Sequence, residues 1–140
     1  MLTALDGTKL DEYVRQPGVT ILDWRHPKNT WSVACDRVLQ RASDVHRDVR
    51  FGAVDVSRHP DLAVEWNVEQ IPTLMGYRDG VLVFSRPGAL PEQAVSALIE
   101  AMWSLDIDEV KRGMDGTRTM LAFRDGQQPL FETVSVARDA

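Results

Sequence analysis

Apolar and polar residues alternate along the first hundred positions with two different periods. Residues 19–24 and 50–56 are nearly continuous apolar runs with many β-branched side chains, a pattern typical of buried strands. Between them, over about residues 30–46, apolar side chains recur at helical spacing, and a shorter amphipathic stretch over residues 8–16 precedes both. The pattern therefore predicts helix, strand, helix and strand in that order.

The second half of this region predicts a hairpin between two helices. Apolar runs over residues 73–77 and 81–84 flank Asp79-Gly80, and this dipeptide between apolar runs is a strong hairpin signal. A short helix follows Pro60, and Pro91 opens a last amphipathic helix. The whole order predicts an α/β architecture in which a central mixed sheet is flanked by helices.

The pattern changes after about residue 105. Residues 107–111 favour a short helix, and residues 117–123 and 130–136 resemble two strands joined by a turn. We therefore expect a domain over residues 1–105 and a C-terminal extension over residues 106–140. An isolated hairpin is marginal in water, so it should dock on the domain, on a partner or on a second copy in a homodimer through residues 117–136.

Composition excludes several classes of function. The chain has 140 residues and a formal charge of −5, which disfavours nonspecific nucleic-acid binding. It contains no apolar run of about 18 residues, so we expect no membrane association. The first residues lack the basic start and apolar segment of a signal peptide, and we expect a cytoplasmic protein.

One cysteine, Cys35, restricts the chemistry further. It excludes an intrachain disulfide, a C-x-x-C dithiol and a cysteine-rich zinc site. His46 and His59 are far apart along the chain, so they indicate no metal site. We expect neither a metal ion nor a cofactor.

Four short segments, in this order, resemble landmarks of the thioredoxin family. They are Val56-Ser57-Arg58-His59-Pro60, Asn67-Val68-Glu69-Gln70-Ile71-Pro72-Thr73, Tyr77-Arg78-Asp79-Gly80-Val81 and Gly88-Ala89-Leu90. The resemblance covers about residues 19–105 and implies a thioredoxin-like fold with a C-terminal hairpin extension. It also implies a cis peptide bond before Pro72 and a general role in cell redox homeostasis.

The redox motif of that family is degenerate here. Counted from Asp23 without gaps, the four positions of C-x-x-C fall on Asn29, Thr30, Trp31 and Ser32. Cys35 then lies almost one turn further, on the apolar stripe of the helix, and we interpret it as a buried small hydrophobe. The alternative is a gap that would move Cys35 to the position of one redox cysteine.

Asp23 resembles the buried carboxylate beneath the family's active site. Ala53 stands where the family often has a lysine beside that carboxylate. Two interpretations remain open: a structural role, with hydrogen bonds to Arg25, His26 or Thr30, and a proton-transfer role in a redox reaction.

Three hypotheses about function follow. In the preferred one, the surface at Trp31, Ile71, Pro72, Thr73 and Gly88 holds an extended segment of a protein partner, as a chaperone or assembly adaptor would. This hypothesis predicts no classical thiol-disulfide oxidoreductase activity. The alternative is a thioredoxin-family oxidoreductase that uses Cys35 and Asp23, or a partner's thiol. A third is a purely architectural subunit.

Overall fold

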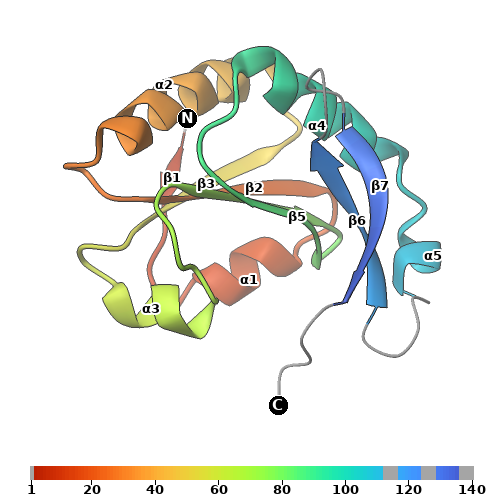
Figure 1. Ribbon diagram of the computed structural model, residues 1–140, viewed down its shortest axis with the longest axis horizontal. Helices are drawn as coiled ribbons and strands as arrows, with labels where there is room; N and C mark the ends of the chain where they lie inside the picture. Colours follow the sequence, from red (N-terminus) through yellow and green to blue (C-terminus); the bar gives the residue numbers. More distant parts are fainter. Residues whose placement is uncertain (1, 112–116, 124–128, 136–140) are drawn as a thin grey trace.

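The centre of the protein is a mixed β-sheet. The computed structural model describes residues 2–111, 117–123 and 129–135. Within them, a five-stranded sheet has the order β1-β3-β2-β4-β5 (Figure 1). Its strands are β1 (Thr3–Ala4), β2 (Val19–Arg25), β3 (Arg50–Asp55), β4 (Thr73–Arg78) and β5 (Val81–Pro87).

The directions of the strands confirm the predicted mixed sheet. β3 runs parallel to both β1 and β2, whereas β4 runs antiparallel to β2 and to β5. The turn between β4 and β5 lies at Asp79 and Gly80, which have φ of 51° and 81°. Positive φ at both positions suits a two-residue hairpin turn. The Gly18 N–H donates to Asp79 Oδ1 at 2.6 Å, which ties this turn to the start of β2.

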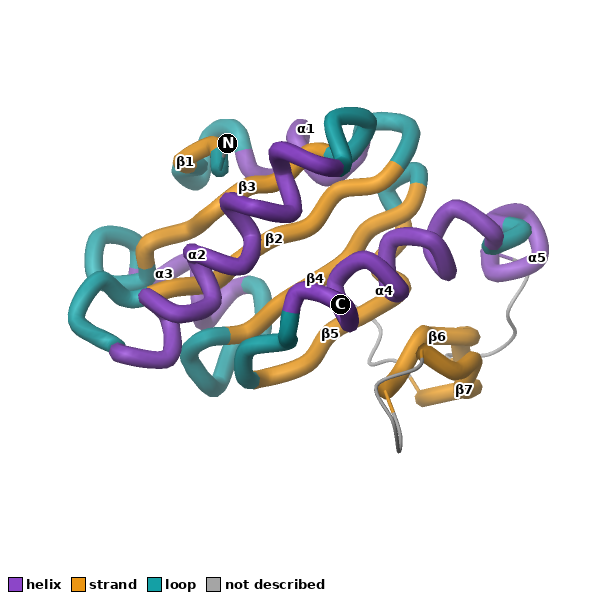
Figure 2. The backbone as a smooth tube through the Cα atoms, turned by 90° about the horizontal axis from the view of Figure 1, so that it is seen from above, coloured by secondary structure: helices purple, strands orange, loops and turns teal. Residues whose placement is uncertain are grey.

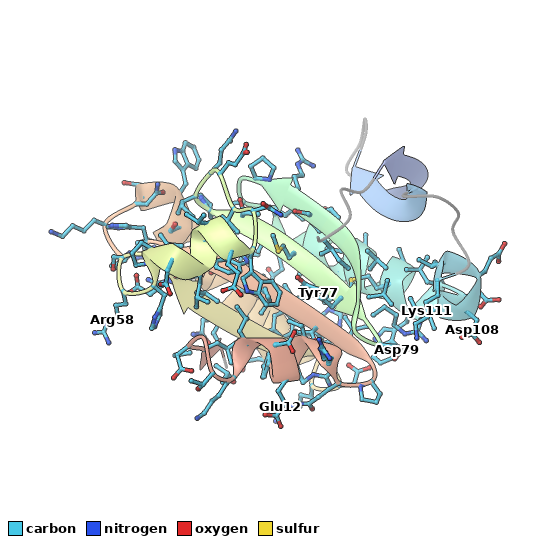
Figure 3. All side chains as sticks on the ribbon, turned by 90° about the horizontal axis from the view of Figure 1, so that it is seen from below. Glu12, Arg58, Tyr77, Asp79, Asp108 and Lys111 are labelled. Atoms are coloured by element: carbon cyan, nitrogen blue, oxygen red, sulfur yellow. The ribbon has the colours of Figure 1, made fainter. Side chains whose placement is uncertain are left out.

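Helices cover both faces of the sheet (Figure 2). The helices α2 (Thr30–Val45) and α4 (Glu92–Ser104) share one apolar cluster with the sheet, and α1 (Leu10–Arg15) and α3 (Pro60–Glu65) share the other. Figure 3 shows the second layer from below, with Tyr77 in its interior and Glu12 and Arg58 pointing outward.

Alternation along β2 decides which residues lie beneath α2. Ile21 belongs to the cluster under α2 and α4, whereas Leu22 and Trp24 belong to the cluster under α1 and α3. Because successive strand residues point to opposite faces, Asp23 points to the same face as Ile21. The strand therefore places the Asp23 carboxyl group beneath α2.

The C-terminal segment adds a second, smaller sheet. After α5 (Ile107–Lys111), β6 (Thr117–Phe123) pairs antiparallel with β7 (Pro129–Ser135), so the fold class with its hairpin extension is confirmed. The hairpin lies beside β5 and α4 (Figure 1). Among the described strands it is not hydrogen-bonded to the five-stranded sheet.

Arg78 connects β4 to the C-terminal end of α4. Its Nη1 donates to the carbonyl oxygens of Met102 and Leu105 at 3.1 and 2.9 Å. Its guanidinium also lies over the ring of Trp103, 5.5 Å from the centroid. These contacts satisfy carbonyl groups that the end of a helix leaves without an intrahelical partner.

Within the described residues, no helix combines the length and apolar character needed to cross a bilayer.

Candidate functional site

Asn29, at the first of the four positions predicted for the degenerate motif, begins the helix α2. It is the N-cap of α2, and its Oδ1 accepts a hydrogen bond from the Ser32 N–H at 3.0 Å. Asparagine is a preferred N-cap because its side-chain oxygen satisfies a backbone N–H that the helix leaves free. The four motif positions therefore form the cap and first turn of α2.

Two hydrogen bonds bring the predicted binding residues together. Asn29 Nδ2 donates to the Ile71 carbonyl oxygen at 3.4 Å, and the Gly88 N–H donates to the Pro72 carbonyl oxygen at 2.7 Å. The Ile71–Pro72 peptide bond is cis, and Gly88 has φ of 95°, in the left-handed region that favours glycine. Three segments that are distant in sequence thus meet at one end of the sheet.

The side chains at this end differ in exposure. Trp31, on the first turn of α2, is 71% exposed, and Ile71 and Gly88 are partly exposed. Pro72 and Thr73 are buried, and the Thr73 hydroxyl donates to the Gln70 carbonyl oxygen. Trp31 and Ile71 can therefore contact a partner directly, whereas the side chain of Thr73 supports the loop from beneath.

Ser32, at the last of the four positions predicted for the degenerate motif, has a structural contact. It is fully buried, and its Oγ accepts a hydrogen bond from the His26 N–H at 3.2 Å. The His26 ring in turn accepts from the Lys28 N–H through Nδ1 at 3.0 Å. These bonds hold the loop that precedes α2 in a compact conformation.

Cys35 lies inside the protein. Its side chain is 1% exposed and packs in the cluster that contains Leu39 and Ala42, on the inward face of α2. Burial raises the pKa of the Cys35 thiol, and the carboxyl groups of Asp23 and Asp36 raise it further. Since the thiolate is the nucleophile, this environment keeps the sulfur in its unreactive form.

Asp23 has a partner that sequence reasoning missed. Asp23 is fully buried, and its pKa lies well above the usual range, first because burial penalises the charged form and second because Asp36 is its hydrogen-bonding neighbour. In the described part of the chain, no donor faces either oxygen of Asp23 or Oδ1 of Asp36. A proton on Asp23 would supply a donor between the two carboxyl groups, in agreement with the raised pKa of Asp23.

The expected partners of Asp23 were therefore wrong. Arg25 donates through Nε to Asp36 Oδ2 at 2.7 Å. Its charge lowers the pKa of Asp23, but burial and the neighbouring Asp36 raise that pKa by more. Ala53 stands directly opposite Asp23 on β3 and offers no cation. Asp36 comes four residues after Ser32, so both lie on one face of the helix, but this spacing does not identify Asp23 as the partner of Asp36.

This end of the sheet therefore offers an exposed indole, a carboxamide and backbone groups rather than reactive sulfur. Among the described residues, no group of three or more His, Cys, Asp or Glu side chains is placed to hold a metal ion. The arrangement can make apolar contacts and hydrogen bonds with another chain.

Comparisons with known proteins match the same region. The family model described as Thioredoxin matches residues 29–101. The protein named "Putative thioredoxin 2" of Streptomyces coelicolor is 39% identical over 87 residues, which is 60% of this chain and 65% of that protein. The chain thus spans slightly less than two thirds of the length of this relative.

Solved structures agree with the sequence comparison. Mitochondrial thioredoxin 3 from Saccharomyces cerevisiae, in its oxidized form, has a TM-score of 0.64 at 26% identity, and the match covers 71% of this chain and 94% of that one. Chloroplastic thioredoxin z has a TM-score of 0.70 at 16% identity over 74% and 96% of the two chains, which shows likeness of fold alone. By its sequence and by its fold, the chain belongs to the thioredoxin family.

Proposed function

We propose that this chain is a protein-binding member of the thioredoxin family that works without a redox dithiol. It holds an extended segment of a protein partner at the surface of Trp31, Ile71 and Gly88, which Pro72 and Thr73 support. One observation carries the proposal: at the position of the nucleophile, the carboxamide of Asn29 bonds to both α2 and the Ile71 carbonyl. These two bonds support a binding surface that forms without either sulfur atom.

The exposure of Trp31 supports a contact role for this surface. At 71% exposed it is one of the most exposed large apolar side chains among the described residues, and it lies two positions after Asn29. Tryptophan is enriched among the few interface residues that supply most of the binding energy. A partner that covers this indole would gain the free energy of burying its apolar area.

The alternative is a thiol-disulfide oxidoreductase that acts through Cys35. The names of the relatives favour it, because they are called thioredoxins. The burial of Cys35 and its raised pKa oppose it, because the thiol is neither accessible nor readily ionised. The two functions differ in which side chain they require.

Partner capture with matched variants tests the proposal. We would immobilise the parent chain, Trp31→Ala, Val45→Ala and Cys35→Ala, and quantify the proteins that each retains from a lysate of the native host. Val45 is the control, because it is 72% exposed on the same helix but lies at its other end. We expect Trp31→Ala alone to lose the specific partner.

A disulfide-reduction assay tests the alternative with the same proteins. With dithiothreitol as the electron source, we expect the parent chain and Cys35→Ala to reduce insulin at the same background rate. Turnover above background that disappears in Cys35→Ala would show an oxidoreductase and would refute the binding proposal as the main function.

A further inference from the structure

The carboxamide of Asn29 uses both of its ends within the protein. Its oxygen accepts from the Ser32 N–H at 3.0 Å, and its nitrogen donates to the Ile71 carbonyl oxygen at 3.4 Å. These two partners fix the orientation of the amide, because only the oxygen can accept from an N–H and only the nitrogen can donate to a carbonyl. Asn29 therefore connects α2 to a loop 42 residues away in sequence.

The second of these bonds occupies a group that a partner strand would use. A strand that adds to another backbone pairs with both the N–H and the C=O of the residue opposite it. At Ile71 the C=O already has the Asn29 amide as its donor. No acceptor among the described residues pairs with the Ile71 N–H. A backbone carbonyl oxygen has two lone pairs, so the Asn29 amide competes with a partner's N–H for this oxygen without filling it. The Ile71 backbone thus presents an open donor beside an acceptor that already has one donor.

We propose that Asn29 is a latch over the Ile71 carbonyl and that it determines which extended segments this surface accepts. A partner binds through a backbone carbonyl oxygen that accepts from the Ile71 N–H, and it needs no N–H opposite the Ile71 carbonyl. The segment class therefore includes chains with proline at that position, since proline has no N–H to offer. This inference rests on the proposed binding function and adds the specificity to it.

Two substitutions remove the latch and keep the helix cap. Asn29→Ser and Asn29→Asp retain a side-chain oxygen at a position where serine and aspartate cap about as well as asparagine. The aspartate carboxylate has no N–H to donate, and the serine side chain is too short to extend to the loop. In either variant, a partner's N–H no longer competes with the Asn29 amide for the Ile71 carbonyl.

The test uses an uncharged extended probe, the acetylated and amidated pentapeptide Thr-Val-Thr-Val-Thr, and analogues that each carry one backbone N-methyl group. Binding is followed by amide NMR spectra of the parent chain and of Asn29→Ser, with the signals of Ile71 and of the Asn29 side chain as reporters. We expect Asn29→Ser to bind the unmodified probe about two- to tenfold more tightly, which corresponds to one additional neutral hydrogen bond.

The N-methyl analogues distinguish a latch from a purely structural residue. We expect the parent chain to bind one of these analogues as tightly as it binds the unmodified probe. For that same analogue, we expect Asn29→Ser to lose its higher affinity and to bind no more tightly than the parent chain. The same N-methyl profile in both proteins, or weaker binding by Asn29→Ser and Asn29→Asp, would refute the latch and leave the binding function intact. If the unmodified probe shifts no signal of the parent chain, the binding surface itself is wrong.

Discussion

The buried carboxyl pair of Asp23 and Asp36 leads to the most quantitative prediction. Asp23 lies under α2 without exposure, and its neighbour is another carboxylate rather than a cation. Replacing Asp23 with asparagine keeps the shape of the side chain and removes its charge. The amide nitrogen of the variant can also donate to Asp36, whose Oδ1 has no donor among the described residues.

The sign of the pH dependence follows from the raised pKa of Asp23. In the unfolded chain the group loses its proton near pH 4, whereas in the folded protein it keeps the proton to a higher pH. Between these two pKa values the folded state binds one more proton, so the free energy of unfolding falls by about 1.4 kcal/mol per pH unit as the pH rises. This loss is complete only above the folded pKa.

The magnitude follows from the cost of a buried charge. Replacing a buried ion pair with apolar residues of similar volume is often neutral or stabilising by about 1–4 kcal/mol, and a neutral amide in place of a buried carboxylate removes a desolvation cost of the same kind. We therefore expect Asp23→Asn to raise the free energy of unfolding by about that amount at pH 8, with little change near pH 4. Asp36→Asn should keep part of the pH dependence, because burial alone still raises the pKa of Asp23.

Urea denaturation followed by tryptophan fluorescence, repeated from pH 4 to pH 9, measures both effects. The free energy of unfolding of the parent chain should fall as the pH rises between the unfolded-state and folded-state pKa values of Asp23. The free energy of unfolding of Asp23→Asn should fall much less over the same range. A variant that is less stable than the parent at pH 8, or one with an unchanged pH slope, would refute the reasoning about the carboxyl pair.

Three further predictions concern single side chains. Arg78→Ala should lower the free energy of unfolding by about 2 kcal/mol, because it loses two hydrogen bonds to carbonyl groups and the contact with Trp103; urea denaturation with unchanged stability would contradict this. Asn29→Ala should cost about 1 kcal/mol by the same assay, whereas Asn29→Asp should cost much less because it keeps the cap. Cys35 should react slowly with a thiol reagent until denaturant is added, and rapid labelling of the folded protein at neutral pH would show that the thiol is accessible.

The sheet and its helices could be predicted because their signals are local. The apolar run that forms β2 and the turn residues Asp79 and Gly80 each lie within a few positions of the structure they specify. The helical spacing in α2 places Cys35 on the inward face without any knowledge of its neighbours. Patterns of this kind report burial directly, since burial follows the period of the element.

The contacts within the site could not be predicted in the same way. Asp23 and Asp36 meet because β2 and α2 pack together, and Asn29 reaches Ile71 across 42 residues of chain. Neither pair has a local signal that distinguishes its partner from other polar residues nearby. The bond from the Thr73 hydroxyl to the Gln70 carbonyl oxygen likewise depends on the path of the backbone.

The central claim is that this surface binds a partner through Trp31 and without the thiol. The most direct test is the dissociation constant of the captured partner for the parent chain, Trp31→Ala and Cys35→Ala. Loss of an interface hot spot costs about 2 kcal/mol or more, so we predict that binding weakens about thirtyfold in Trp31→Ala and changes less than twofold in Cys35→Ala. Binding that depends on Cys35 and not on Trp31 would contradict the account.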